Sequence, residues 1–196
     1  MILTDLEIRE KVKEINLIEN FEEDNLQSES YDLRLGDEIS ILDRTPRIIS
    51  VKNNKDLETL YETKKLDESG YSLIPGEYVL VKIKEKINLP DNLNAHIRPR
   101  TRFTRLGLIV SDQHCNSTYC GNLQIGIFNA TNSTIQIFPD INICQIVFEE
   151  LKSIPSTNKQ YKNKKNAAYQ NEEEFRGPKV DEKILNELYK KVLGRD

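Results

Sequence analysis

The chain has 196 residues, of which 37% are hydrophobic and 31% charged, which suits one globular domain with modest appendages. Its formal net charge of −4 argues against a general nucleic-acid-binding protein, because such proteins rely on cations that release the counterions of many phosphates. No apolar run approaches the roughly 20 residues that span a bilayer, and the N-terminus lacks the pattern of a signal peptide, so we expect a cytoplasmic protein without a membrane segment.

Three cysteines, Cys115, Cys120 and Cys144, form an odd set without a disulfide framework, which fits a reducing compartment and buried thiols. Together with Cys115 and Cys120, His114 gives only three candidate metal ligands, and the His-x-Glu and Pro-Cys-x-x-Cys pattern of zinc deaminases is absent. We therefore expect no metal site.

The N-terminal residues predict a short amphipathic helix that begins after Thr4. Thr4 and Glu7 have the spacing of a capping box, and apolar residues recur at helical spacing at Leu3, Ile8, Val12 and Ile15. Residues 27–36 then predict a strand, because Tyr31, Leu33 and Leu35 alternate with Asp32 and Arg34 before the turn signal Gly36.

Short apolar segments separated by turn signals follow. Residues 43–70 are polar and suggest a surface excursion, residues 79–87 alternate as a half-buried strand, and residues 89–90 end it. Further strands are predicted at 108–110, at 123–129 after a polar loop, at 135–138 after a hairpin-like turn, and at 141–148. This pattern favours an all-β barrel or sandwich.

The composition changes after the last predicted strand. Residues 152–179 are rich in Lys, Asn, Gln and Glu and predict a mobile or conditionally ordered tail, whereas residues 180–196 predict a helix with Ile184, Leu188 and Val192 on one stripe. We therefore divide the chain into a β-domain at 1–151, a tail at 152–179 that closes over a site, and a C-terminal helix at 180–196.

Positive charge gathers at residues 98–108, where Arg98, Arg100, Arg102 and Arg105 lie between two apolar segments. In an acidic protein, this segment is where an anionic ligand is expected to bind. The alternative is a solvated basic strand that pairs with surface carboxylates, and such pairs contribute only about 0–1 kcal/mol to stability.

Several motifs resemble the dCTP deaminase branch of the dUTPase superfamily. They are MILTDLEI at 1–8, QSESYDLRLG at 27–36, IPGEY at 74–78, LP at 89–90, RLGL at 105–108, YCG at 119–121 and ICQIVFE at 143–149. The resemblance covers about residues 1–151 and continues faintly through Tyr161 and residues 168–170. It implies a mostly β, distorted dUTPase-like barrel of the β-clip type, assembled as a homotrimer with nucleotide sites shared between subunits.

The family's phosphate-binding signature places its two arginines at Arg100 and Arg105, whereas its two serines become Thr101 and Arg102. Forked cationic donors suit phosphate, so the resemblance implies a phosphorylated nucleotide as the ligand. Mg²⁺ is expected only as the companion of a bound nucleoside triphosphate. The altered serines predict a pocket that differs in shape, in ligand, or in both.

The family's catalytic carboxylates are replaced. The proton-handling glutamate of the deaminases aligns with Gly126, and the water-activating aspartate of the dUTPases aligns with Asn116, and neither residue is a base near neutral pH. In the tail, a family lysine becomes Ala168 and a family glutamine becomes Glu172, next to Glu173 and Glu174. These three carboxylates are expected to disfavour a triphosphate.

Three further residues complete the predicted nucleotide site, and each has an ordinary structural explanation beside it. Tyr119 either stacks on a base or packs its turn, Gln145 either supports the site or is an ordinary strand residue, and Tyr161 belongs to the matching part of the tail.

We therefore predict a nucleotide-binding protein without turnover that holds or sequesters a phosphorylated nucleotide, with a nucleotide second messenger as one candidate. The first alternative is an active dCTP deaminase or dUTP diphosphatase in which another carboxylate, with Asp112 the nearest, supplies the base. The second alternative is a scaffold for a protein partner.

Overall fold

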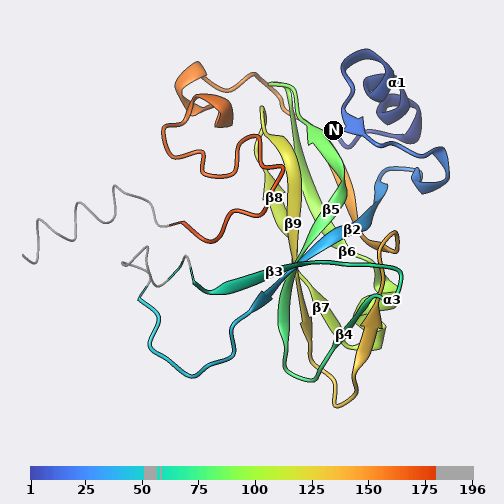
Figure 1. Ribbon diagram of the computed structural model, residues 1–196. Coiled ribbons are helices and arrows are strands. Elements are labelled where there is room, and N and C mark those ends of the chain that lie inside the picture. The colour runs from blue at the N-terminus through green and yellow to red at the C-terminus, as the bar shows by residue number, and fades with distance from the viewer. Residues whose placement is uncertain (51–56, 58, 180–196) are drawn as a thin grey trace, which may run out of the picture.

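The computed structural model describes residues 1–50, 57 and 59–179, and within them the chain is mostly β-structure (Figure 1). The predicted C-terminal helix lies outside the described residues. The strands are β1 (Ile18–Glu19), β2 (Tyr31–Leu42), β3 (Tyr61–Lys65), β4 (Tyr71–Leu73), β5 (Tyr78–Asn88), β6 (Leu93–Pro99), β7 (Leu108–Val110), β8 (Gln113–Cys115), β9 (Cys120–Asn129), β10 (Ile135–Ile137) and β11 (Asn142–Glu150). The helices are α1 (Asp5–Ile15) and α3 (Thr101–Leu106), with 3₁₀ turns η1 (Glu23–Asn25), η2 (Thr157–Lys159) and η3 (Tyr161–Asn163).

One large sheet forms most of the molecule. Its nine strands follow the order β7-β9-β5-β2-β11-β6-β8, with β1 on β5 and β3 on β2, while β4 and β10 form a separate antiparallel pair. The sheet curls on itself around the core, where side chains such as those of Leu33, Val81, Ile127 and Phe148 are 0% exposed. The predicted mostly β, barrel-like fold is therefore confirmed.

The predicted N-terminal helix is confirmed as α1. The Thr4 N–H donates to Glu7 Oε2 at 2.8 Å, which closes the N-terminal turn, and Asn16 ends the helix with φ of 54°. Ile8 of this helix is fully buried, but Ile15 is 42% exposed, so the buried stripe of α1 ends before its last turn.

The strand predicted at 27–36 is longer than expected, and its polar face is not solvated. β2 continues through Gly36 to Leu42, so the turn predicted at Gly36 is wrong. Gly36 lies at a shift in register between β2 and β5, where a Cβ would be 2.9 Å from the Lys82 carbonyl oxygen. Glycine is therefore needed for close approach of two strands rather than for a turn.

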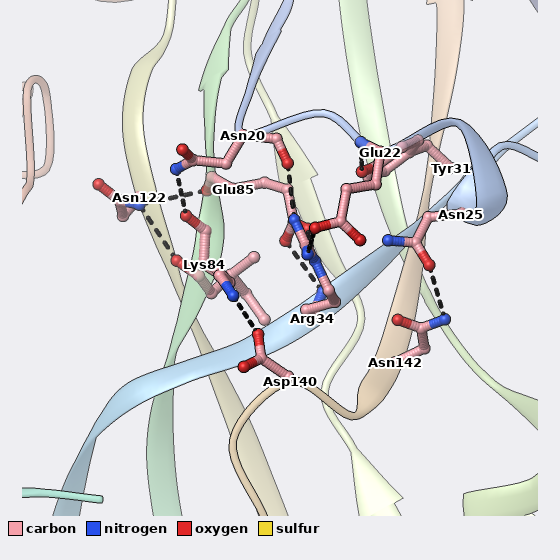
Figure 2. Close-up of polar contacts among 11 residues, drawn as sticks. Asn20, Glu22, Asn25, Tyr31, Arg34, Lys84, Glu85, Asn122, Asp140 and Asn142 are labelled. Carbon is pink, nitrogen blue, oxygen red and sulfur yellow. Dashed lines mark hydrogen bonds and ion pairs between the residues drawn. The ribbon is translucent and has the colours of Figure 1, made fainter.

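Arg34 is buried in a network of polar groups that joins three parts of the chain (Figure 2). Its Nε donates to Glu85 Oε1 at 2.7 Å, its backbone N–H donates to Glu85 Oε2 at 2.9 Å, and its guanidinium also pairs with Glu22 and donates to the Asn20 carbonyl. Burial raises the pKa of Glu85, although Arg34 opposes that rise. The network satisfies two charges that would otherwise be costly to bury.

The segment with four arginines is mostly helical and is not the solvated basic strand of the alternative interpretation. β6 ends at Pro99, and residues 101–106 form the short helix α3, which is anchored by buried Phe103 and ended by Gly107 at φ of 90°. The Gly107 N–H bonds back to the Thr104 carbonyl oxygen at 3.1 Å, as glycine-terminated helices do.

Three other local predictions need correction. The surface excursion at 43–70 contains β3, and the polar loop at 111–122 contains β8 and the first residues of β9. The turn at 130–133 is not a hairpin, because β10 pairs with β4 and not with β9.

The tail lies against the barrel beside β8 and β9 (Figure 1). The Asn171 N–H donates to the Cys120 carbonyl at 2.8 Å, and the Asn122 N–H donates to the Glu172 carbonyl at 2.7 Å. A segment predicted to be mobile or conditionally ordered is thus docked by backbone hydrogen bonds to the start of β9.

Two of the three free cysteines, Cys115 and Cys144, are buried as expected, while Cys120 is only partly buried and its thiol contacts Asn88 Oδ1 at 3.0 Å. No helix within the described residues has the length and apolar character needed to cross a membrane.

Candidate functional site

A cavity of about 450 Å³ lies between the docked tail and the barrel. Five aromatic side chains line it: Tyr61 from β3, Tyr119 from the turn before β9, and Tyr161, Tyr169 and Phe175 from the tail. Its volume falls in the range of small-molecule sites, roughly 300–1,000 Å³. The tail therefore completes a cavity whose size and aromatic walls suit a flat ring.

Tyr119 both packs its turn and contributes to the cavity. It is 7% exposed, its hydroxyl donates to the Asn122 carbonyl at 3.3 Å, and its ring centroid is 5.9 Å from that of Tyr161. Burial raises the pKa of its hydroxyl, so the group stays protonated. The structure thus brings together Asn116, Tyr119 and Tyr161, three of the predicted site residues, along one cavity.

The polar groups of the cavity come from both the barrel and the tail. Asn116 and Gln124 supply amides, Glu172 supplies a carboxyl, and Arg176 lies beside it. Glu172 is 3% exposed, and burial raises its pKa to about 7, although the Arg176 N–H and guanidinium oppose the rise. Cavity residue His114 has a lowered pKa because of burial and because His96 and Lys164 lie nearby.

The space beside Gly126 is filled by Tyr78. A Cβ built on Gly126 would lie 2.2 Å from the Tyr78 hydroxyl oxygen and 2.8 Å from its Cζ. The Gly126 N–H is also bonded to Ser111 Oγ at 2.9 Å. The position that aligns with the deaminase glutamate therefore has no room for a larger side chain while Tyr78 keeps this orientation.

The predicted phosphate ligands lie away from the cavity. Arg100 pairs with Asp32, a residue of β2 that is only 2% exposed, while Thr101, Arg102 and Arg105 are exposed on α3. Within the described part of the chain, neither Arg102 nor Arg105 forms an ion pair. These two guanidinium groups are therefore free to bind an anion.

The tail and α3 lie near opposite ends of β9. The tail bonds to Cys120 and Asn122 at the start of β9. At the other end, the carbonyl of Gly107, which ends α3, accepts from the N–H of Ala130, the residue after β9, at 3.1 Å. The cavity extends along β9 to Gln124 and to Leu80 of β5, which pairs with Gly126, but no arginine of α3 lines it.

Two other predicted residues lie outside the cavity. Gln145, on β11, is partly buried and accepts a long bond of 3.4 Å from Ser30 Oγ. Asp112 has a side chain that is 73% exposed and lies 3.6 Å from Arg98 Nη1, so it is poorly placed to act as a base in the cavity.

Two residues of interest were not identified as such from the sequence. Tyr78 was part of a family motif without an assigned role, and Glu172 was grouped with its two neighbours. The structure separates these carboxylates, because Glu173 pairs with Lys86 at 2.8 Å and Glu174 is exposed, so that Glu172 alone of the three lines the cavity. The three carboxylates therefore do not line the cavity together, and the expectation that they disfavour a triphosphate stays a prediction.

Among the described residues, no three His, Cys, Asp or Glu side chains come together in a way that could hold a metal ion.

Comparison with known proteins agrees with the fold and with the resemblance in sequence. The family model described as dCTP deaminase-like matches residues 2–151. A dUMP-forming dCTP deaminase of Persephonella marina is 33% identical over 161 residues, which cover 81% of this chain and 88% of that protein. A dCTP deaminase of Thermococcus kodakarensis is 32% identical over 158 residues, with coverage of 81% and 88%.

A solved structure supports the fold independently. The 2'-deoxycytidine 5'-triphosphate deaminase of Agrobacterium tumefaciens superposes with a TM-score of 0.63 at 22% identity and covers 76% of this chain and 48% of that one. Since the family model spans most of the chain and relatives above 30% identity match along most of their length, the chain belongs to the dCTP deaminase-like family.

Proposed function

We propose that this protein binds a phosphorylated nucleotide without turning it over by the mechanism of the deaminases. The observation that carries the proposal is Gly126, which stands at the position of the family's proton-handling glutamate and is covered by Tyr78. A general acid–base group contributes about 10²–10⁴-fold to rate, so its loss removes a large part of catalysis. Asn116 at the dUTPase aspartate position supports the same conclusion.

The binding half of the proposal rests on two features. The aromatic cavity offers stacking faces for a base, and the guanidinium groups of Arg102 and Arg105 are exposed and unpaired within the described residues. Because no arginine of α3 lines the cavity of its own chain, we propose that the nucleotide bridges two copies of the chain in a homotrimer, with the arginines of one subunit facing the cavity of the next.

A second candidate, deamination of dCTP, is favoured by the names of the relatives and by one residue. Relatives at 30–33% identity are named dCTP deaminases. Glu172 places a buried carboxyl with a pKa of about 7 in the cavity. A general acid–base group works best when its pKa lies close to the working pH, so this carboxyl suits catalysis near neutral pH. Under this alternative, Glu172 and not Asp112 supplies the base.

One experiment separates the two candidates. The purified full-length protein is incubated with dCTP, dUTP and a panel of linear and cyclic nucleotides, and both the products and the bound ligand released by denaturation are identified. We expect intact nucleotide and no deoxyuridine product, with binding lost in Arg105→Ala and kept in Lys13→Ala, an exposed control on α1. Release of ammonia from dCTP that disappears in Glu172→Gln would instead establish the deaminase.

Mixing tests the shared site. If a site takes Arg105 from one subunit and Glu172 from the next, mixed assemblies of Arg105→Ala and Glu172→Ala chains contain some intact sites, so the mixture binds nucleotide that neither variant binds alone. Absence of any gain after mixing, with assembly confirmed by light scattering, would contradict a site shared between subunits.

A further inference from the structure

Glu172 is held in a fixed place by its own backbone. Its carbonyl accepts from the Asn122 N–H at 2.7 Å, and it pairs as a parallel bridge with Gly121. A Cβ on Gly121 would lie 2.9 Å from the Glu172 nitrogen, and Gly121 has φ of 147°, so glycine is required for this close contact. The tail therefore sets Glu172 against the barrel at one place.

Arg176 closes the tail around this residue. Its guanidinium donates to the carbonyl oxygens of Ala168, Gln170 and Asn171 at 3.2, 2.9 and 3.0 Å, and its N–H donates to Glu172 Oε1 at 2.8 Å. The guanidinium is thus occupied in shaping the loop rather than in pairing with the carboxylate. Glu172 keeps its acceptor capacity while its position is fixed from both sides.

The Glu172 carboxyl keeps acceptor positions that its own chain does not use. Glu172 is 3% exposed and lines the cavity, and its side chain accepts one hydrogen bond among the described residues, from the Arg176 N–H to Oε1. A carboxylate has about four lone-pair positions, so others remain for a ligand. A ligand in this cavity that supplies N–H donors can therefore bond to this carboxyl.

The chemistry of an ionised carboxylate favours one kind of base. It accepts hydrogen bonds only, so it matches an edge that presents two neighbouring N–H donors and no acceptor. Guanine presents such an edge with its ring N–H and its 2-amino group, whereas cytosine and adenine place a ring acceptor beside the amine and uracil flanks its N–H with two carbonyl oxygens. Two parallel charge-assisted bonds are the strong form of this pairing.

We infer that Glu172 is the base-reading residue of the nucleotide site and that the cavity takes a guanine nucleotide, with the ring against the tyrosines and the 2-amino edge on the carboxylate. This inference rests on the proposed nucleotide-binding function and names its ligand. Glu172 differs from the glutamine at the aligned family position, because a glutamine side chain offers both a donor and an acceptor.

The test compares GTP with ITP, which differ only by the 2-amino group, together with dCTP and dUTP, by titration calorimetry at pH 8. A hydrogen bond to a charged group is worth about tenfold or more in affinity, so we expect wild-type protein to bind GTP at least about tenfold more tightly than ITP. Glu172→Gln should reduce that ratio to about threefold or less, while Glu173→Gln, a change to the exposed neighbour paired with Lys86, leaves it unchanged.

The outcomes are distinct. Equal affinity for GTP and ITP in the wild-type protein, or tightest binding of dCTP, overturns the guanine assignment while leaving nucleotide binding intact. Failure of all four nucleotides to bind overturns this inference, and failure of the whole nucleotide panel as well overturns the proposed function. The comparison of GTP with ITP in the wild-type protein needs no variant, so misfolding of Glu172→Gln does not remove the test. Glu172→Asp keeps the charge on a shorter side chain and should lower GTP affinity more than ITP affinity.

Discussion

Replacing Glu172 by glutamine should remove most of the pH dependence of tail docking. Burial raises the pKa of Glu172 from 4.5 to about 7 when the tail is docked. A difference of about 2.5 in pKa corresponds to roughly 3 kcal/mol, at about 1.4 kcal/mol for each pKa unit. The docked tail therefore holds a proton that the released tail gives up as the pH rises from about 4.5 to 7.

The sign of the effect follows from that proton. Because the docked state binds more protons in this window, docking is strongest near pH 5 and weakens as the pH rises, and the opening of the tail should increase on the order of a hundredfold by pH 8. The lowered pKa of His114 acts in the opposite direction, since its neutral form is favoured in the folded protein as the pH rises through 6.5. Glu172→Gln keeps His114, so the difference between the two proteins isolates Glu172.

Hydrogen exchange measured by mass spectrometry on peptides covering 168–176 provides the assay, after correction for the intrinsic pH dependence of amide exchange. The wild-type protein should lose protection between pH 5 and pH 8, and Glu172→Gln should lose much less, while Glu173→Gln should follow the wild type. Equal pH dependence in the wild type and Glu172→Gln would refute the assignment of a raised pKa to this residue.

Three further predictions concern the barrel. Gly126→Ala should cost roughly 1–3 kcal/mol in urea unfolding, because its Cβ would overlap the Tyr78 hydroxyl, and the cost should shrink in a Tyr78→Ala background. Arg34→Met should lower the free energy of unfolding by roughly 3–5 kcal/mol, because Glu85 is left buried and unpaired. The double variant Arg34→Met with Glu85→Leu should recover much of that loss. A loss below about 1 kcal/mol in the single variant would contradict the role of the pair. Cys120 should react with maleimide before the two buried cysteines, as peptide mass spectrometry would show, because burial raises the pKa of those thiols; equal rates in the native protein would contradict it.

The strands with clear alternation were predictable from the sequence, but the arginine segment was not. Residues 79–87 alternate apolar and polar side chains and lie within β5. Residues 101–106 form only six residues of helix with a single buried anchor, Phe103, which is too short to show a helical period. The one available signal was Gly107 directly after Leu106, since glycine commonly ends helices.

The environment of charged residues was predicted least well. Alternation at Asp32 and Arg34 predicted a strand but gave no sign that both charged residues are buried, each with an opposite charge supplied by another part of the chain. The position of Glu172 was hidden for a similar reason, because the tail docks through backbone hydrogen bonds to residues about fifty positions earlier, and backbone groups leave no mark on side-chain composition.

The arrangement of the site itself argues for a role of a second copy. Arg100, the first arginine of the phosphate signature, is paired with a buried carboxylate of its own chain, which fixes the position where α3 begins and leaves Arg102 and Arg105 exposed. The aromatic cavity meanwhile carries the carboxyl of Glu172, which repels phosphate and attracts N–H donors. Our proposal places the base of a nucleotide in the cavity and its phosphates on α3. Since no arginine of α3 lines the cavity of its own chain, that proposal requires a partner subunit to supply one of the two surfaces.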